Sequence, residues 1–214
     1  MDIVGASAGM VVMGPSIVII GVALRRTMGR PVLYRQVRIG RGGRPFVMPK
    51  FRTMSEGDGS RGSVTIADDP RVTRLGRALR RTRLDELPQL WCVIRGEMSL
   101  VGPRPDVPGY ADMLQGRDRA VLELRPGITG PATLAFRDEE SLLASVADPL
   151  RYNDEVIYPA KTRLNVAYLE HWSLRGDCLY LLATLHPAFE RWLPAAGHPR
   201  VPAAWQSPGP EGLA

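Results

Sequence analysis

The central part of the chain, residues 69–105, reads DPRVTRLGRALRRTRLDELPQLWCVIRGEMSLVGPRP. Its first half is rich in arginine, and Leu75 and Leu79 stand at helical spacing within it. This pattern predicts a basic amphipathic helix within residues 69–83, of the kind that suits a membrane surface, a phosphate site or nucleic acid. Charge alone does not choose among the three.

The second half of this segment opens on an acidic pair, Asp85 and Glu86. Pro88 has no backbone N–H and is tolerated in a helix only in the first turn, so a second helix is predicted to begin near Asp85 and to run to Ile94. The pair then lies at a helix N-terminus, where free N–H groups and the helix dipole attract anions. Two interpretations stay open: Asp85 caps the helix, which is a common task of aspartate, or the pair serves an anion site.

Prolines also stiffen two turns that contain arginine. VGPRP at residues 101–105 holds the chain extended around Arg104 and aims that side chain. RPGITG at residues 125–130 forms a second rigid turn at Arg125. Each turn, taken alone, is an ordinary loop.

The flanking segments supply the rest of the predicted fold. Strand-forming residues on both sides of GRGG, at residues 40–43, predict a β-hairpin. Residues 151–185 alternate aromatic, apolar and charged side chains and predict two helices divided near Ser173. Residues 194–214 are rich in Pro, Ala and Gly, which predicts a disordered tail. We therefore expect an α+β fold that is predominantly helical, with a small β-hairpin.

The N-terminal segment is the most apolar part of the sequence. Residues 3–24 carry no charge, and a helix of these 22 residues would just cross a bilayer core of roughly 30 Å. Gly14 and Pro15 interrupt the run at its middle, and a proline there removes a backbone hydrogen bond, so a sharp kink is expected. The residues alone leave two arrangements open: a kinked span, or a re-entrant helix whose ends lie on one face of the membrane.

The composition narrows the class of protein. The chain holds 28 Lys and Arg against 22 Asp and Glu, and Lys50 is the only lysine before residue 160. The planar guanidinium group of arginine donates two hydrogen bonds to phosphate oxygens better than lysine does, so the excess of arginine favours a polyanionic partner such as nucleic acid, anionic lipid or a nucleotide. A genome of high GC content produces the same excess of arginine over lysine. Two cysteines without C-x-x-C spacing and three scattered histidines argue against a disulfide framework and a zinc site.

Taken together, these segments resemble the bacterial sugar transferase family, the monotopic phosphoglycosyl transferases that start lipid-linked glycan assembly. The resemblance rests on PVLYRQVRIGRGGRPFVMPKFRTM from Pro31, the segment quoted above from Asp69, RPGITG from Arg125 and YLEHWSLRGD from Tyr168. These blocks follow one order over most of residues 2–185, and KFRTM, LDELPQL and SLVGPRP together are highly specific. The chain resembles the small members that consist of the catalytic domain alone.

The resemblance implies a two-step transfer. In the family, the aspartate at the position of Asp85 attacks the β-phosphate of a nucleotide diphosphosugar, usually a UDP-sugar, releases UMP and holds the phosphosugar as an acyl phosphate. Polyprenyl phosphate, such as undecaprenyl phosphate, then takes the phosphosugar, which is the first membrane step of exopolysaccharide, O-antigen or glycoprotein glycan synthesis. We expect the helix N-terminus and the arginines to lower the pKa of Asp85 and keep it ionised.

The resemblance also assigns the other site residues. Glu86 matches the family's ligand of Mg²⁺, the expected cofactor, and completes the catalytic pair with Asp85. Substrate contacts are implied for five further residues: Lys50, Arg80, Arg104, Arg125 and Asn165. Asn165 stands where relatives commonly carry aspartate, so this chain is expected either to bind more weakly or to use Asp154 or Glu155 instead.

For the N-terminal segment, the resemblance favours the re-entrant arrangement. In the family this helix is broken at a Ser-Pro pair and keeps both ends cytoplasmic; here Pro15 aligns and Gly14 replaces the serine. We expect a re-entrant membrane helix over residues 1–28 and a catalytic domain over residues 29–193, which faces the cytoplasm from the bacterial inner membrane. The implied partners are the bilayer, a UDP-sugar and polyprenyl phosphate, without nucleic acid, and a homodimer is compatible with the pattern.

Two other classes of protein stay as alternatives. A basic nucleic-acid-binding protein would use residues 71–91 as a helix-turn-helix, although the prolines and the apolar N-terminal segment suit it badly. A catalytically weakened scaffold is indicated only by Gly14 and Asn165.

Overall fold

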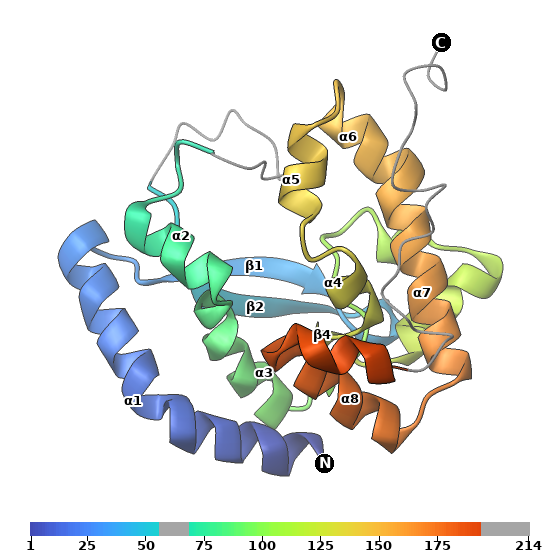
Figure 1. Ribbon diagram of the computed structural model, residues 1–214, viewed down its shortest axis with the longest axis horizontal. Coiled ribbons are helices and arrows are strands. Elements are labelled where there is room, and N and C mark those ends of the chain that lie inside the picture. Colours follow the sequence, from blue (N-terminus) through green and yellow to red (C-terminus); the bar gives the residue numbers. More distant parts are fainter. Residues whose placement is uncertain (56–68, 194–214) are drawn as a thin grey trace.

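The computed structural model describes residues 1–55 and 69–193 (Figure 1). Its helices are α1 (Asp2–Met28), α2 (Arg74–Arg81), α3 (Leu90–Ile94), α4 (Pro131–Ala135), α5 (Glu139–Ala144), α6 (Pro149–Tyr152), α7 (Tyr158–Glu170) and α8 (Leu174–Leu185). Its strands form two two-stranded sheets: β1 (Leu33–Ile39) with β2 (Pro45–Phe51), and β3 (Ser99–Val101) with β4 (Gly127–Thr129). The short 3-10 segments are η1 (Arg41–Gly43), η2 (Leu84–Gln89), η3 (Ala111–Met113), η4 (Gly116–Glu123) and η6 (Pro187–Trp192), and η5 (Asn153–Ile157) is a π-helical turn. The predominantly helical α+β class is confirmed, and the predicted tail at 194–214 lies outside the described residues.

The predicted β-hairpin is confirmed. β1 and β2 pair antiparallel, with Val37 opposite Val47. The turn between them is η1, in which Gly42 and Gly43 take positive φ values of 68° and 76°, a conformation that glycine adopts without strain. Phe51 is buried, so the hairpin contributes one face to the core.

The basic amphipathic helix is confirmed in a shorter form. α2 begins at Arg74 because the side chain of Thr73 accepts a hydrogen bond from the backbone N–H of Gly76, at 2.9 Å. Leu79 is buried and Leu75 packs beside it in a hydrophobic cluster, which fixes the apolar face of the helix.

The segment after α2 differs from the single helix that was predicted. Arg83 takes a left-handed conformation with a φ of 55°, which few residues other than glycine adopt, and turns the chain sharply. The 3-10 turn η2 follows and contains Pro88, and α3 begins only at Leu90. The proline therefore limited where the α-helix can start, as expected, but a tighter turn fills the residues before it.

Residues 71–91 do not form a helix-turn-helix. α3 has five residues, and its Leu90 and Val93 are buried in one cluster with Ala6 of α1. A recognition helix must present its side chains to a DNA groove, so the nucleic-acid-binding interpretation of this segment is wrong.

The two arginine-containing turns lie side by side, which the sequence did not predict. β3 and β4 pair in parallel, with Ser99 opposite Gly127. The approach is so close that a Cβ on Gly102 would lie 2.5 Å from the carbonyl oxygen of Arg125. Glycine is required there because no side chain fits between the two backbones.

The predicted division of the C-terminal helices is confirmed at Ser173. Its side chain accepts a hydrogen bond from the backbone N–H of Gly176, at 3.1 Å, and so caps the start of α8. α7 precedes this cap and packs against α4, and Tyr168 of α7 and Tyr180 of α8 meet edge to face in the core.

α1 is the long apolar helix that the sequence predicts. Its most apolar window has a mean hydropathy of 2.1 with 11% of its residues buried, so by length and composition it could cross a membrane. Figure 1 shows α1 bent in its middle, with its two halves running in different directions. Pro15 lies inside the helix and accounts for the bend, since it removes one backbone hydrogen bond.

Both halves of α1 pack on the body of the protein. Ala6, in the first half, is fully buried beside α3, whereas Ile20 and Leu24, in the second half, are buried against β2 and α2. The opposite surface of the helix exposes large apolar side chains that extend over both halves: Ile3, Val4, Val11, Val12, Val18, Ile19 and Val22.

Candidate active site

The acidic pair lies on the 3-10 turn η2, which packs against β2 and α2. Asp85 and Glu86 are 7% and 8% exposed, respectively. Arg83 occupies the N-cap position of η2, and its side chain makes no capping hydrogen bond. The interpretation of Asp85 as a helix cap is therefore wrong, because its carboxylate bonds to no backbone N–H among the described residues.

Glu86 is held by Arg104. The Nη2 atom of Arg104 donates a hydrogen bond of 2.5 Å to Oε1 of Glu86. Arg104 stands between two prolines in the segment after β3, and Nη1 of Arg38 donates to the carbonyl oxygen of Pro105, at 2.9 Å. The backbone anchored at Pro105 thus places Arg104 in contact with the acidic pair.

Three of the predicted cationic residues act on the pair from different elements. Lys50 of β2, Arg104 and Arg80 of α2 are the positive charges that stabilise ionised Asp85, in that order. Lys50 lies 5.4 Å from the ring centroid of Tyr34, and burial together with the charge of Arg104 lowers the pKa of Lys50. The structure therefore brings Lys50, Arg80 and Arg104 together with the acidic pair.

The prediction that Asp85 has a lowered pKa is wrong. Burial, followed by the charge of Glu86, raises the pKa of Asp85 to about 6, and the three cations offset only part of this effect. Glu86 behaves in the opposite way: burial favours its protonated form, but the charge and hydrogen bond of Arg104, with Arg83 and Lys50, hold its pKa below the usual range. The arginines therefore stabilise the ionised form of Glu86 more than that of Asp85.

Arg125 and Asn165 are not brought into this cluster. Arg125 is exposed at the turn before β4, and its charge is not among those that act on Asp85 or Glu86. Asn165 lies on α7, 7% exposed, with its Oδ1 atom buried and without a hydrogen-bond partner in the described part of the chain.

Several charged residues near the cluster were not predicted. Arg83 acts on Glu86, and Asp106, two residues after Arg104, faces Lys161 of α7. Lys161 itself pairs with Glu139, at 2.6 Å. The signal for Asp106 was its place directly after VGPRP; nothing in the sequence relates it to Lys161, more than fifty positions away.

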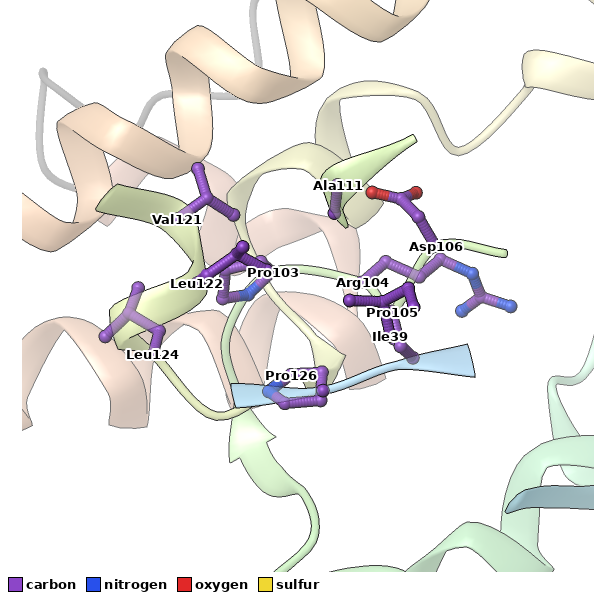
Figure 2. A pocket seen from close by; sticks show the side chains of 11 residues that line it. Ile39, Pro103, Arg104, Pro105, Asp106, Ala111, Val121, Leu122, Leu124 and Pro126 are labelled. Carbon is purple, nitrogen blue, oxygen red and sulfur yellow. The ribbon is translucent and has the colours of Figure 1, made fainter. Parts of the chain in front are cut away.

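A small pocket lies beside the segment that carries Arg104 (Figure 2). Its lining is mostly apolar and includes Ile39, Val121 and Leu124. In Figure 2 the guanidinium of Arg104 and the carboxylate of Asp106 lie at one end of the group, away from Val121 and Leu124. The apolar side chains thus line one end of the pocket, and the two charged groups lie at the other end.

A Mg²⁺ ion at this site would need phosphate oxygens of a substrate among its ligands. Within residues 1–55 and 69–193, no cluster of three or more His, Cys, Asp or Glu side chains could hold a metal alone. The Oε2 atom of Glu86, however, is buried without a partner. Mg²⁺ is commonly bound by one or two carboxylates together with substrate phosphates and waters, and Glu86 offers one such oxygen beside Asp85.

Comparison with known proteins gives a consistent result. Residues 1–191 match the family described as bacterial sugar transferase. The chain is 36% identical over 162 residues to the uncharacterized sugar transferase EpsL of Bacillus subtilis, which covers 76% of this chain and 72% of that protein. It is 36% identical over 191 residues to the UDP-glucose:undecaprenyl-phosphate glucose-1-phosphate transferase of Caulobacter vibrioides, covering 86% of this chain and 67% of that protein. The UDP-galactose-lipid carrier transferase of Erwinia amylovora is 32% identical over 209 residues, and the match spans 89% of this chain but only 40% of that longer protein.

Proposed function

The chain belongs to the bacterial sugar transferase family, and we propose that it moves a sugar phosphate from a UDP-sugar to undecaprenyl phosphate. Relatives named for this transfer support the substrate classes. The observation that carries the proposal is the buried acidic pair: Asp85 has no hydrogen-bond partner in the described residues, and three cations surround it. A carboxylate placed in this way is free to attack a phosphorus atom whose oxygens the cations neutralise.

In the first step, an oxygen of ionised Asp85 forms a bond to the β-phosphorus of the UDP-sugar. The bond from that phosphorus to the oxygen bridging to the α-phosphate breaks, and UMP leaves with the electron pair. The phosphosugar is then held on Asp85 as an acyl phosphate. Lys50, Arg80 and Arg104, whose charges act on Asp85, would neutralise the negative charge that gathers on the phosphoryl oxygens.

In the second step, a phosphate oxygen of undecaprenyl phosphate attacks the same phosphorus. The bond from phosphorus to Asp85 breaks, which returns the carboxylate and gives undecaprenyl diphosphosugar. Because each step exchanges one P–O bond for another, no oxidant or further reactant is needed. The product is a lipid-linked sugar, the starting point of a polysaccharide such as an exopolysaccharide.

We expect the reaction to require Mg²⁺. Glu86, through its unpartnered Oε2 atom, would hold the ion together with phosphate oxygens of the donor. The ion would supply positive charge to the diphosphate. Arg104 orients Glu86 for this task through the hydrogen bond to Oε1.

The attachment of α1 supports a re-entrant membrane helix. At its start, Oδ1 of Asp2 accepts hydrogen bonds from Oγ of Ser99 and the backbone N–H of Leu100, at 3.0 and 3.2 Å. At its end, Arg52, directly after β2, donates to the carbonyl oxygen of Met28. A straight span would carry one end about 30 Å away across the bilayer, whereas here both ends are bonded to one body. We propose that this body lies on the cytoplasmic side of the inner membrane.

The topology is tested by cysteine labelling. In a chain whose Cys92 and Cys178 are replaced by alanine, a single cysteine is introduced either directly after Met1 or at Arg26. For the re-entrant helix, a membrane-impermeant maleimide labels neither position in intact spheroplasts and both after lysis. Labelling of one position in intact spheroplasts would show that α1 spans the membrane.

The activity is tested by release of UMP from a panel of UDP-sugars in the presence of undecaprenyl phosphate and Mg²⁺. Without the acceptor lipid, a donor labelled with ³²P at the β-phosphate should leave label on the protein. Asp85→Asn should abolish both signals, and Asp118→Asn, the same change at an exposed position, should alter neither. If no UDP-sugar yields UMP, the proposed function is wrong. If Asp85→Asn still turns over, the covalent mechanism is wrong.

A further inference from the structure

Asp106 is a second half-buried carboxylate that the proposed reaction leaves without a role. It lies two residues after Arg104, and the carbonyl oxygen of Asp106 accepts a hydrogen bond from the backbone N–H of Ile39, at 2.8 Å. The segment is therefore fixed against the end of β1. The side chain makes no hydrogen bond or ion pair with any residue that the structure describes, although Lys161, Arg38 and Arg104 act on it electrostatically.

One face of α7 lies toward Asp106. Tyr158, Lys161 and Asn165 are spaced by three and four residues, so they project from the same side of the helix. Both Lys161 and Tyr158 interact electrostatically with Asp106, which places this face of α7 toward the carboxylate.

Several polar atoms in this region are buried without partners. The hydroxyl of Tyr158, Oδ1 of Asn165 and Nε of Arg38 have no hydrogen-bond partner among the described residues, and Asn165 is 7% exposed. Thr133 of α4, the helix that packs against α7, leaves a fourth such atom, its Oγ1. Buried polar groups are normally satisfied, so unpartnered donors and acceptors on α7, its neighbour α4 and β1 indicate a ligand with hydroxyl groups or ordered water.

The position of Asp106 relative to Arg104 identifies the part of the donor that reaches it. Two residues of extended chain advance about 6.6 Å, so Asp106 lies one short step beyond the arginine that faces the reacting phosphate. The sugar is attached directly to that phosphate. The phosphate of the acceptor and the diphosphate of the donor are anions, which the carboxylate of Asp106 repels. The hydroxyl groups of a sugar, in contrast, donate hydrogen bonds that a carboxylate accepts.

We propose that Asp106, with Tyr158 and Asn165 on the facing side of α7, forms the subsite that binds the sugar of the UDP-sugar donor. The inference rests on the proposed function. A site built to hydrogen-bond hydroxyl groups discriminates strongly against donors that lack them in the required positions, because its polar atoms are then left unpaired. The identity of the transferred sugar is thus set here, apart from the groups that carry out the transfer.

The test separates sugar contacts from phosphate and uracil contacts by using UDP, which lacks the sugar. The KM for the best donor among UDP-glucose, UDP-galactose and UDP-N-acetylgalactosamine is compared with the inhibition constant of UDP. Asp106→Asn should raise the KM roughly tenfold to a hundredfold, the factor of one lost hydrogen bond to a charged group, and should change the inhibition constant of UDP less than twofold. Tyr158→Phe, which removes only the hydroxyl, should act in the same direction to a smaller extent.

Controls keep the outcome decisive. Asp118→Asn, at an exposed position, should move neither constant, and thermal unfolding of each variant reports whether it is folded. A variant too slow for kinetics is measured by calorimetric binding of the UDP-sugar and of UDP in the Asp85→Asn background. If both constants rise together, Asp106 contacts the diphosphate or uracil and the proposal is wrong; it is also wrong if neither moves. Absence of UMP release by the wild-type protein would instead refute the proposed function.

Discussion

Asparagine in place of Asp85 is expected to stabilise the free protein at neutral pH, while it abolishes turnover. Asp85 is 7% exposed, and burial followed by the charge of Glu86 raises its pKa from 3.8 to about 6. A carboxyl with a higher pKa in the folded than in the unfolded protein binds its proton more tightly when folded. Ionisation of Asp85 therefore costs stability, and asparagine, which stays neutral, does not carry this cost. The side chain of Asp85 makes no hydrogen bond with the described residues, so Asp85→Asn breaks none.

The size of the effect follows from the shift. At pH 7.5, above both pKa values, the cost is complete: a shift of roughly 2 pH units at 1.36 kcal/mol each gives about 3 kcal/mol. The cost decreases as the pH falls from about 6 to 3.8 and is absent below that range. For a protein of this size, about 1 kcal/mol corresponds to a change of roughly 2–4 °C in Tm, so Asp85→Asn should melt some 5–10 °C above the wild type at pH 7.5.

Thermal unfolding of the detergent-solubilised protein, without nucleotide or Mg²⁺, measures this difference between pH 4.5 and pH 8. The difference in Tm between Asp85→Asn and the wild type should grow with pH and level off above pH 6.5. Asp118→Asn, whose carboxyl is exposed, should show no such trend. An Asp85→Asn protein that is less stable than the wild type at pH 7.5, or a difference independent of pH, would refute the conclusion that burial dominates at this carboxylate.

Three further outcomes are expected. The kcat/KM of the wild type should fall about tenfold per pH unit below pH 6, because in the proposed mechanism only ionised Asp85 attacks. Lys50→Met should move the midpoint of this profile upward, because it removes a charge that lowers the pKa of Asp85; a flat profile between pH 5 and pH 7 would contradict the assignment of Asp85 as the nucleophile. Glu86→Gln should raise the Mg²⁺ concentration needed for half-maximal UMP release at least tenfold, as measured by metal titration, and an unchanged requirement would remove Glu86 as the ligand. Gly102→Ala should destabilise the protein by about 1–3 kcal/mol in thermal unfolding, because the added Cβ would lie 2.5 Å from the carbonyl oxygen of Arg125. Gly14→Ala is the control, since a Cβ at Gly14 meets nothing within 4 Å and the substitution should be tolerated.

Features with a local cause could be predicted from the sequence. The hairpin turn follows from adjacent glycines, the start of α8 from the side chain of Ser173, and the bend of α1 from Pro15. In each case the deciding atoms lie within four residues of one another. Such interactions are encoded in a short stretch of sequence, and they form in the same way in most structural contexts.

Features that depend on distant segments could not be predicted. The pairing of β3 with β4 requires two glycine-containing loops to meet backbone to backbone, and no periodicity indicates this contact. The pKa of Asp85 was predicted with the wrong sign because the arginines are visible in the sequence, but the burial that outweighs them is not. For the same reason Arg125, which looks equivalent to Arg104 in a proline-stiffened turn, lies apart from the acidic pair.

The attachment points of α1 connect the proposed membrane helix to the acidic pair. Asp2 bonds to Ser99 and Leu100 of β3, and the chain continues from β3 through Gly102 to Arg104. Arg52, which holds the other end of α1, follows Lys50 of β2 at a distance of two residues. The two ends of the apolar helix are therefore bonded to the two segments that bring cations to Asp85. In the proposed membrane arrangement, a helix fixed at both ends in this way would hold the acidic pair at a constant depth relative to the membrane surface. The phosphate of a polyprenyl acceptor would lie at that surface while its chain stays in the bilayer.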